Sequence, residues 1–292
     1  MSGNADWRAR LTRLQLDIGQ HWIVRRVLAV MDVTNRAGGP LLAAALAFGT
    51  MFAVIPTVLL LSGVLGWIVD DPQLRNELLV ELIGAFPPLA DVFEDSLEAV
   101  VDARGALTIV GLVGLLWGAS NFYANLEAVM VRIFEGGEPR DMIRQRVRGF
   151  LTVVVLVGLV IATIGLSGFF AFVQATVEGV IAWQAVALAV PLAVMVVVVW
   201  LCYRLVPTAP PSWGAAFVPA VIAGIGIGLL TNVFSVLAPL LLAGLSGFGV
   251  IATVFGALIW LNLCFQLLLY GAAWARYRRD REAIVGGPLP GL

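Results

Sequence analysis

Long apolar stretches alternate with short polar segments along the chain, and their lengths predict helices that cross a membrane. A transmembrane helix needs about 20 consecutive, mainly apolar residues. Six stretches reach this length, and they cover roughly residues 40–69, 106–134, 147–177, 183–206, 215–242 and 250–275. The pattern predicts an all-α, polytopic membrane protein with six transmembrane helices.

The remaining segments divide the chain further. Residues 1–38 place apolar and aromatic side chains at steps of three or four among arginines, which predicts a cytoplasmic amphipathic segment in the membrane interface. Residues 39–279 form the membrane domain, and residues 280–292 are expected to be a flexible cytoplasmic tail. Residues 70–104 are too acidic to be inserted, yet they keep helical spacing on both sides of a Pro-Pro pair. We expect an amphipathic helical hairpin on the outer face, and its acidic residues are either a solvated surface or a cation site.

The distribution of arginine predicts the orientation of the chain. All basic residues are arginine, and sixteen of the 18 fall in segments that six spans would place on one side, whereas Arg75 and Arg104 belong to the acidic hairpin. Cytoplasmic segments of membrane proteins carry the excess of positive charge. Both termini are therefore predicted to be cytoplasmic. Five of these arginines, around the end of the second span, are also candidate ligands of lipid head groups: Arg132, Arg140, Arg144, Arg146 and Arg148.

Two spans carry files of polar side chains, which should point away from lipid because polar groups inside a membrane are costly. The candidate residues of a substrate path are Asn121, Tyr123, Asn125 and Glu127 in the second span, and Asn262 and Gln266 in the sixth. They could form such a path only if the two files face each other across the interior of the helix bundle. Glu127 has two open interpretations. It either faces a ligand or forms a structural ion pair with Arg132.

Prolines and glycines inside the spans are candidate hinges. Pro56 lies near the middle of the first span, where it either marks a packing kink or acts as a gating hinge. The fifth span contains Pro219 and a GxxxG pattern at Gly224 and Gly228. This pattern favours close helix packing, and a homo-oligomer through it or through the outer hairpin is an open alternative.

The residue inventory excludes several classes of enzyme. The chain has one histidine, His21, and two cysteines in apolar stretches, and it lacks a nucleotide-binding loop, a nucleophile elbow and a metal-ligand cluster. We therefore expect no catalytic residue, metal or cofactor. A net charge of −1 gives no reason to expect a nucleic-acid partner, so membrane lipids are the expected partners.

Four segments also carry a family resemblance. AAALAFGTMFAVIP (43–56), NFYANLEAVMVRIFEGGEPRDMIRQRVRGFL (121–151), WGAAFVPAVIAGIG (213–226) and LIWLNLCFQLLLYGA (258–272), in this order, resemble the YihY/virulence factor BrkB family of bacterial inner-membrane proteins and its YhjD-like branch. The resemblance implies a six-helix, multi-pass protein of the bacterial inner membrane, linked to envelope biology and suspected of transport. Gly49, Val131 and Ala273 stand where the family often has an aromatic residue, an asparagine and an acidic residue.

An old label, ribonuclease BN, also follows this family, but the residues of this chain do not fit it. Metal-dependent phosphodiester hydrolysis requires clustered histidines and carboxylates, and a single histidine cannot provide them. The sequence instead favours a non-ATP-driven transporter or flippase-like protein for an envelope lipid or amphipathic anion. The alternatives are a non-transporting structural scaffold of the cell envelope and a lipid-modifying enzyme.

Overall fold

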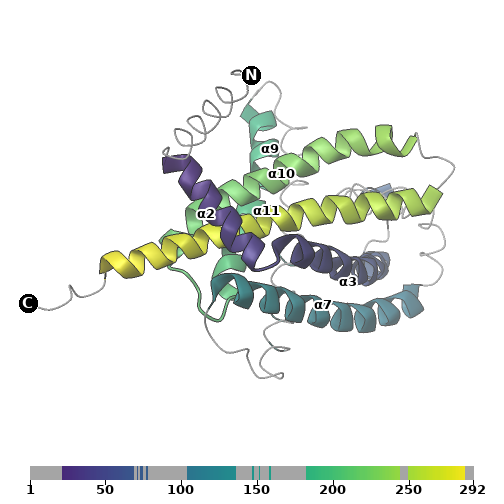
Figure 1. The fold of residues 1–292 in the computed structure, drawn as a ribbon. Helices are drawn as coiled ribbons and strands as arrows, with labels where there is room; N and C mark the ends of the chain where they lie inside the picture. The colour runs from purple at the N-terminus through teal and green to yellow at the C-terminus, as the bar shows by residue number, and fades with distance from the viewer. Residues whose placement is uncertain are drawn as a thin grey trace, which may run out of the picture.

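The computed structural model describes residues 22–68, 104–135, 182–243 and 249–286, together with the single positions 71, 73, 74, 77, 147, 151 and 158. Within the continuous ranges all regular secondary structure is α-helical (Figure 1). The helices are α2 (Trp22–Arg36), α3 (Gly39–Ile68), α7 (Arg104–Phe134), α9 (Ala182–Leu205), α10 (Trp213–Ala243) and α11 (Gly249–Gly286). The all-α prediction is therefore confirmed for these residues.

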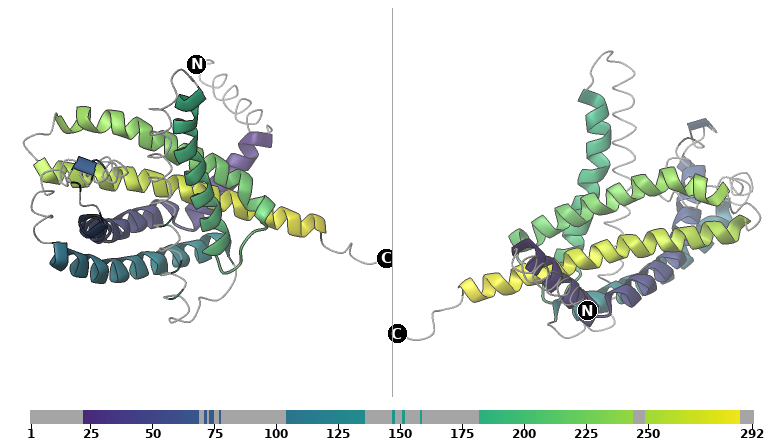
Figure 2. Two further views of the ribbon diagram at one scale, coloured as in Figure 1. Left: turned by 180° about the vertical axis from the view of Figure 1, so that it is seen from behind. Right: turned by 45° about the horizontal axis from the view of Figure 1, so that its top comes forward.

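Helix α11 is the centre of the arrangement. It contacts α2, α3, α7, α9 and α10, and Figure 1 shows it between α10 on one side and the pair α3 and α7 on the other. Its buried face combines large residues such as Leu269 with small ones such as Ala272 and Ala273. Small residues at these positions let neighbouring backbones approach closely. Figure 2 shows that α9 crosses this set and that its N-terminal end stands apart from α10.

Glycines on α7 explain why α7 packs so closely along α3. A Cβ added at Gly111 would lie 2.6 Å from the backbone nitrogen of Leu60, and one added at Gly118 would lie 2.7 Å from the carbonyl oxygen of Phe52. Between them, a Cβ at Gly114 would lie 3.0 Å from the ring of Pro56. Only glycine fits such spacing, so three glycines one turn apart form the contact surface.

The GxxxG pattern of α10 forms a contact within the chain. A Cβ added at Gly224 would lie 2.8 Å from Cα of Val196, and one at Gly228 would overlap the side chain of Leu192. The predicted close packing is therefore present, with α9 as the partner helix. Since α9 of the same chain lies against Gly224 and Gly228, this contact is made within the chain, and a homo-oligomer stays a prediction.

A sharp turn joins α2 to α3. Gly38 adopts a positive φ of 78°, a conformation that suits glycine, and its N–H donates a 2.9 Å hydrogen bond to the carbonyl oxygen of Asn35. The axes of residues 27–36 and 39–53 meet at 65°. The amphipathic N-terminal segment is helical where the structure describes it, in α2, while residues 1–21 lie outside the described residues.

The described helices account for part of the predicted topology. Three of them, 109–134, 213–237 and 251–283, are long and apolar enough to cross a membrane, and residues 27–53 make a fourth if the bent pair is one span. In α9 the apolar segment, 189–205, is shorter. The third predicted span and almost all of the outer hairpin lie outside the described residues, so six spans and the orientation of the termini stay predictions.

Helix α11 also differs from its predicted end. The sixth span was expected to stop near Ala275 and to be followed by a flexible tail from residue 280. Instead α11 continues to Gly286, about three turns further. Residues 276–282 of this extension bind the neighbouring elements, as described below, which gives the helix a reason to continue beyond its apolar part.

Candidate functional site

A cavity of about 880 Å³ opens between α7, α9, α10 and α11. Its described walls are mainly apolar, with Leu126 from α7, Met195 and Val199 from α9, Ile227 from α10 and Leu268 from α11. The loop from Val206 to Pro210 lines it near the C-terminal end of α9. Its volume is in the upper part of the range, about 300–1,000 Å³, that is typical of ligand pockets.

Two aromatic side chains join α7 to α11 at the cavity wall. The rings of Phe122 and Phe265 lie 6.0 Å apart between centroids, and both line the cavity. Cys202 and Cys264 also line it, and neither forms a disulfide. In this apolar setting both thiols act as small hydrophobic side chains.

The polar end of the cavity is formed by Arg204 and Trp213, on either side of the loop between α9 and α10. Cζ of Arg204 lies 4.9 Å from the ring centroid of Trp213. The indole of Trp200 packs edge-on against Trp213 with 4.9 Å between centroids and donates a 3.2 Å hydrogen bond to the Trp213 carbonyl oxygen. The stacked guanidinium is thus held next to an aromatic pair at the end of an apolar chamber.

Tyr203, next to Arg204 in α9, fixes the crossing of α9 and α11. Its hydroxyl is buried and donates a 2.7 Å hydrogen bond to the carbonyl oxygen of Leu268, which lines the cavity. Gly271 lies directly under the same hydroxyl, where a Cβ would overlap it. A buried hydroxyl must find an acceptor, and this one selects the position of α11 relative to α9.

The predicted path residues occupy different surroundings. Of the six, Tyr123 lines the cavity, and the other five are not among its lining residues. Asn121 and Asn125 are exposed on α7, and Nδ2 of Asn125 would lie 3.6 Å from a Cβ at Gly49 on α3. On α11, Gln266 donates a 2.5 Å hydrogen bond to the side-chain oxygen of Asn262.

Glu127 is the most buried of the predicted residues. Its side chain is 1% exposed, one turn beyond the buried Tyr123, whereas Arg132 on the same helix is exposed. The carboxyl group of Glu127 therefore lies inside the helix bundle rather than at its rim. Whether Glu127 faces a ligand or forms an ion pair stays open. Arg140, Arg144, Arg146 and Arg148 lie outside the described residues.

The hinge candidates lie in packed positions. The ring of Pro56 lies against Gly114, Pro219 is buried in α10, and Gly224 and Gly228 lie against α9. Hinge motion at these positions stays a prediction. The chain does bend by 65° at the turn between α2 and α3.

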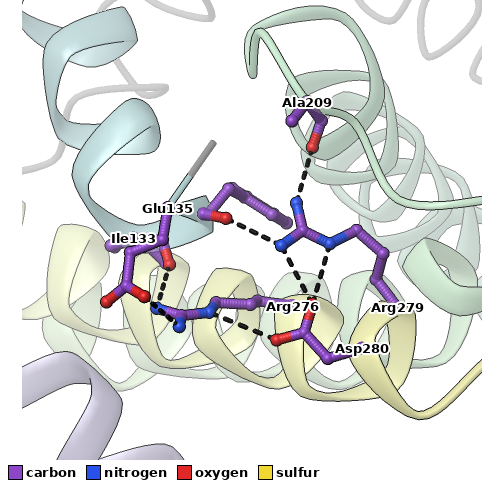
Figure 3. A network of polar contacts seen from close by, with 7 residues as sticks. Ile133, Glu135, Ala209, Arg276, Arg279 and Asp280 are labelled. Atoms are coloured by element: carbon purple, nitrogen blue, oxygen red, sulfur yellow. Dashed lines mark hydrogen bonds and ion pairs between the residues drawn. The ribbon is translucent and has the colours of Figure 1, made fainter. Parts of the chain in front are cut away.

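The arginines of the α11 extension form a polar clasp that the sequence prediction had treated only as an orientation signal (Figure 3). Arg276 donates hydrogen bonds of 2.9 Å to the carbonyl oxygen of Ile133 and of 2.5 Å to the carboxylate of Glu135. The last carbonyl groups of a helix lack intrahelical donors, so Arg276 caps the end of α7.

Arg279 extends the clasp to a second element. It donates a 2.8 Å hydrogen bond to the carbonyl oxygen of Phe134 and a 2.9 Å hydrogen bond to that of Ala209, in the loop that lines the cavity. Asp280 accepts hydrogen bonds from both guanidinium groups and so holds them in place (Figure 3). Nearby, Ser212 donates a 2.7 Å hydrogen bond to Glu282 and caps the first turn of α10.

The clasp affects the acidity of Glu135, which follows α7 at a positive φ of 39°. The hydrogen bond from Arg276 lowers the pKa of this carboxyl below its ordinary value near 4.5. The geometry also bears on topology. The end of α7, the α9–α10 loop and the α11 extension, which were all predicted to be cytoplasmic, meet at the same end of the helices.

Comparison with known proteins places the chain in a family. The family model described as virulence factor BrkB matches residues 30–288. The chain belongs to this family. Among curated proteins it is similar to a UPF0761 membrane protein of Glaesserella parasuis serovar 5 (strain SH0165), with 23% identity over 206 residues, which cover 70% of this chain and 73% of that protein. No solved structure matches the chain.

Membership of the virulence factor BrkB family confirms the resemblance found in the sequence and identifies the chain as a membrane protein. Ala273, one of the departures noted in the sequence, is fully buried. The clasp lies near the C-terminal end of the matched region. The clasp could have been predicted from the arginines that follow the sixth span, because Asp280 comes four residues after Arg276.

Proposed function

We propose that this chain is a non-ATP-driven transporter or flippase-like protein of the bacterial inner membrane, acting on an envelope lipid or another amphipathic anion. The observation that carries the proposal is the cavity, which combines apolar walls from α7, α9, α10 and α11 with Arg204 at one end. A chamber of this kind suits a substrate with an apolar part and an anionic part.

The clasp supports a mechanism for access. Alternating access requires groups of helices that move relative to one another around a fixed site. Arg279 connects the end of α7 to the loop beside the cavity, so its hydrogen bonds hold two walls of the cavity together at the predicted cytoplasmic end. Release of these bonds would let α7 and the loop separate. The proposal assigns no catalytic residue, metal or cofactor to the chain.

Reconstitution into liposomes tests transport. The purified protein should accelerate the movement of labelled anionic lipids between leaflets relative to protein-free liposomes. Met195→Trp, which adds volume to the cavity wall, should reduce this rate, whereas Met31→Trp on the exposed side of α2 should leave it unchanged. A rate equal to that of protein-free liposomes for a panel of phospholipids and polyprenyl phosphates would refute the lipid version of the proposal.

A second candidate is a structural protein of the envelope that transports nothing. The hydrogen bond between Gln266 and Asn262 favours it, because a polar pair that satisfies itself needs no substrate. In this case Met195→Trp would change neither lipid movement nor envelope integrity, while variants of the helix contacts would impair the envelope.

A further inference from the structure

The guanidinium group of Arg204 has an aromatic neighbour on one face and N–H donors that point outward in its plane. Its guanidinium stacks on Trp213 at 4.9 Å from the ring centroid. A stacked guanidinium keeps its N–H groups directed outward in the plane, where they match the oxygens of a phosphate or carboxylate. Among the described residues, no carboxylate forms an ion pair with Arg204.

The burial of this group adds a second observation. Nε of Arg204 is buried and has no hydrogen-bond partner in the structure, although the residue lines the cavity. A buried polar atom without a partner is unfavourable, and for a charged donor the cost is higher than for a neutral one. An anionic acceptor that reaches Nε would remove this cost.

The support of the site is rigid. Trp200 binds Trp213 through both a ring contact and a hydrogen bond to its backbone, and Phe217 packs edge-on against Trp200 at 5.8 Å between centroids. Because Trp213 is the first residue of α10, the backbone contact also fixes where that helix starts. The stacking surface for Arg204 is therefore already formed before any ligand binds.

The remainder of the cavity fits a hydrocarbon chain. Beyond Arg204 its walls continue through Met195, Ile227, Phe265 and Leu268. These side chains bind apolar groups and offer no charged partner. A small inorganic anion would leave this apolar volume unfilled, so the shape of the cavity favours an amphiphile over a free ion.

We infer that Arg204 binds the head group of an anionic amphiphile, a phosphate monoester that carries a hydrocarbon chain, and that this hydrocarbon chain lies in the cavity between α7, α9, α10 and α11. This inference rests on the same cavity as the proposed function and names the substrate class and its head-group ligand. Binding is nevertheless separable from transport, because a protein can bind such a lipid without moving it.

A direct binding measurement tests the inference. The full-length protein in a neutral detergent is titrated with lysophosphatidic acid, with the uncharged monoacylglycerol of the same chain, and with inorganic phosphate, and binding is followed by calorimetry. Lysophosphatidic acid should bind at least about tenfold more tightly than monoacylglycerol, as expected for one hydrogen bond to a charged group. Inorganic phosphate should not displace it.

Three variants locate the site. Arg204→Gln should weaken lysophosphatidic acid binding by about tenfold or more and leave monoacylglycerol binding unchanged, whereas Arg204→Lys should lose less because it keeps the charge. Arg281→Gln is the matched control, since Arg281 is exposed on α11 and does not line the cavity. The melting temperature of each variant shows whether it is folded. If Arg204→Gln does not fold, Arg204→Lys and the ligand panel on the unchanged protein still decide.

The outcomes distinguish a lipid head group from a free anion, and they distinguish lipid binding from transport. Equal affinity for the charged and uncharged lipids, or an Arg204→Gln variant that binds as the unchanged protein does, would overturn the inference and leave Arg204 as an interfacial anchor. Displacement by inorganic phosphate at similar concentration would also overturn it, in favour of a free-anion site. Binding with the expected selectivity but without lipid movement in liposomes would support the inference and refute transport.

Discussion

Arg279 of α11 donates a 2.8 Å hydrogen bond to the carbonyl oxygen of Phe134, the last residue of α7, from a position 145 residues later in the chain. The guanidinium also lies 5.7 Å from the centroid of the Phe134 ring. One side chain thus satisfies an orphan carbonyl group and stacks on the aromatic ring of the same residue. The end of α7 is therefore held by α11.

Replacing Arg279 should destabilise the fold. Arg279→Met keeps the aliphatic part of the side chain but removes the donors to Phe134 and Ala209, so two carbonyl groups lose their partner. Hydrogen bonds to charged groups contribute on the order of 1.5–3 kcal/mol, and the side chain is partly exposed, so we expect a loss near the lower end of that range. Thermal unfolding of the purified protein in detergent measures it.

The neighbouring Arg278 provides the matched control. Arg278→Met removes the same charge from the same turn of α11, and none of the hydrogen bonds of the clasp involves Arg278. Its melting temperature should stay close to that of the unchanged protein. Equal losses for the two variants would show that net charge, and not the clasp, accounts for the effect.

A second prediction concerns Gly271 and Tyr203. Gly271→Ala adds a Cβ that overlaps the Tyr203 hydroxyl and lies 2.8 Å from Cβ of Ala223. Overpacking of this kind costs about 1–3 kcal/mol, and we expect the melting temperature to fall accordingly. Gly214→Ala is the control, because nothing lies within 4 Å of its added Cβ.

Tyr203→Phe should partly rescue Gly271→Ala. The substitution removes the hydroxyl that the new methyl group meets, and by itself it costs the buried hydrogen bond to Leu268. The two changes should therefore be less destabilising together than the sum of the single effects, as a double-mutant cycle would measure. Strict additivity would contradict the contact between the two residues.

The amount that the sequence predicts differs among the helices. The bounds of α7, α9 and α10 agree with predicted spans to within two residues, because long apolar stretches with charged or proline-rich ends leave few alternatives. The contact role of Gly224 and Gly228 was also predictable, but their partner was not. A GxxxG pattern states that a backbone approaches closely, and it carries no information about whether that backbone belongs to α9 or to another copy.

The candidate site was harder to predict, for a physical reason. Sequence reasoning selected polar residues within apolar stretches, such as Asn125 and Gln266, because a polar side chain in a membrane needs an explanation. Of the predicted path residues, Tyr123 lines the cavity, whose other walls are mainly ordinary apolar residues of four helices together with Arg204 at a helix end, where an arginine is unremarkable. A cavity depends on how helices diverge, and that depends on long-range contacts such as the one between Tyr203 and Leu268.

The intrachain role of the α10 glycines gives a third prediction. Gly224→Leu places a large side chain where Val196 now contacts the backbone, so α9 should be displaced and the melting temperature should fall. The oligomeric state, measured by light scattering with correction for detergent, should not change. Ile225→Leu, at the exposed neighbouring position, should have no effect on either quantity. Loss of an oligomer at an unchanged melting temperature would instead indicate a contact between copies.

The fourth prediction uses the ion pair between Glu135 and Arg276. The pKa of Glu135 is lowered below its ordinary value near 4.5, with the hydrogen bond from Arg276 as the main cause. The folded protein thus binds a proton at this carboxyl less readily than the unfolded chain does. The stabilisation is complete above the unfolded pKa and is lost as the pH falls through the lower, folded pKa. Because the Glu135 side chain is 66% exposed, solvent and salt should keep the effect small.

Glu135→Gln isolates this contribution from that of the other carboxyl groups. The variant keeps the shape of the side chain and the left-handed backbone at φ 39° but does not titrate. The unchanged protein should be more stable than the variant at neutral pH, and the difference in melting temperature should shrink as the pH falls below 4.5, the ordinary value. High salt at neutral pH should shrink it as well, because screening weakens an exposed pair. A difference that stays constant with pH would mean that the ionisation of Glu135 does not contribute to stability.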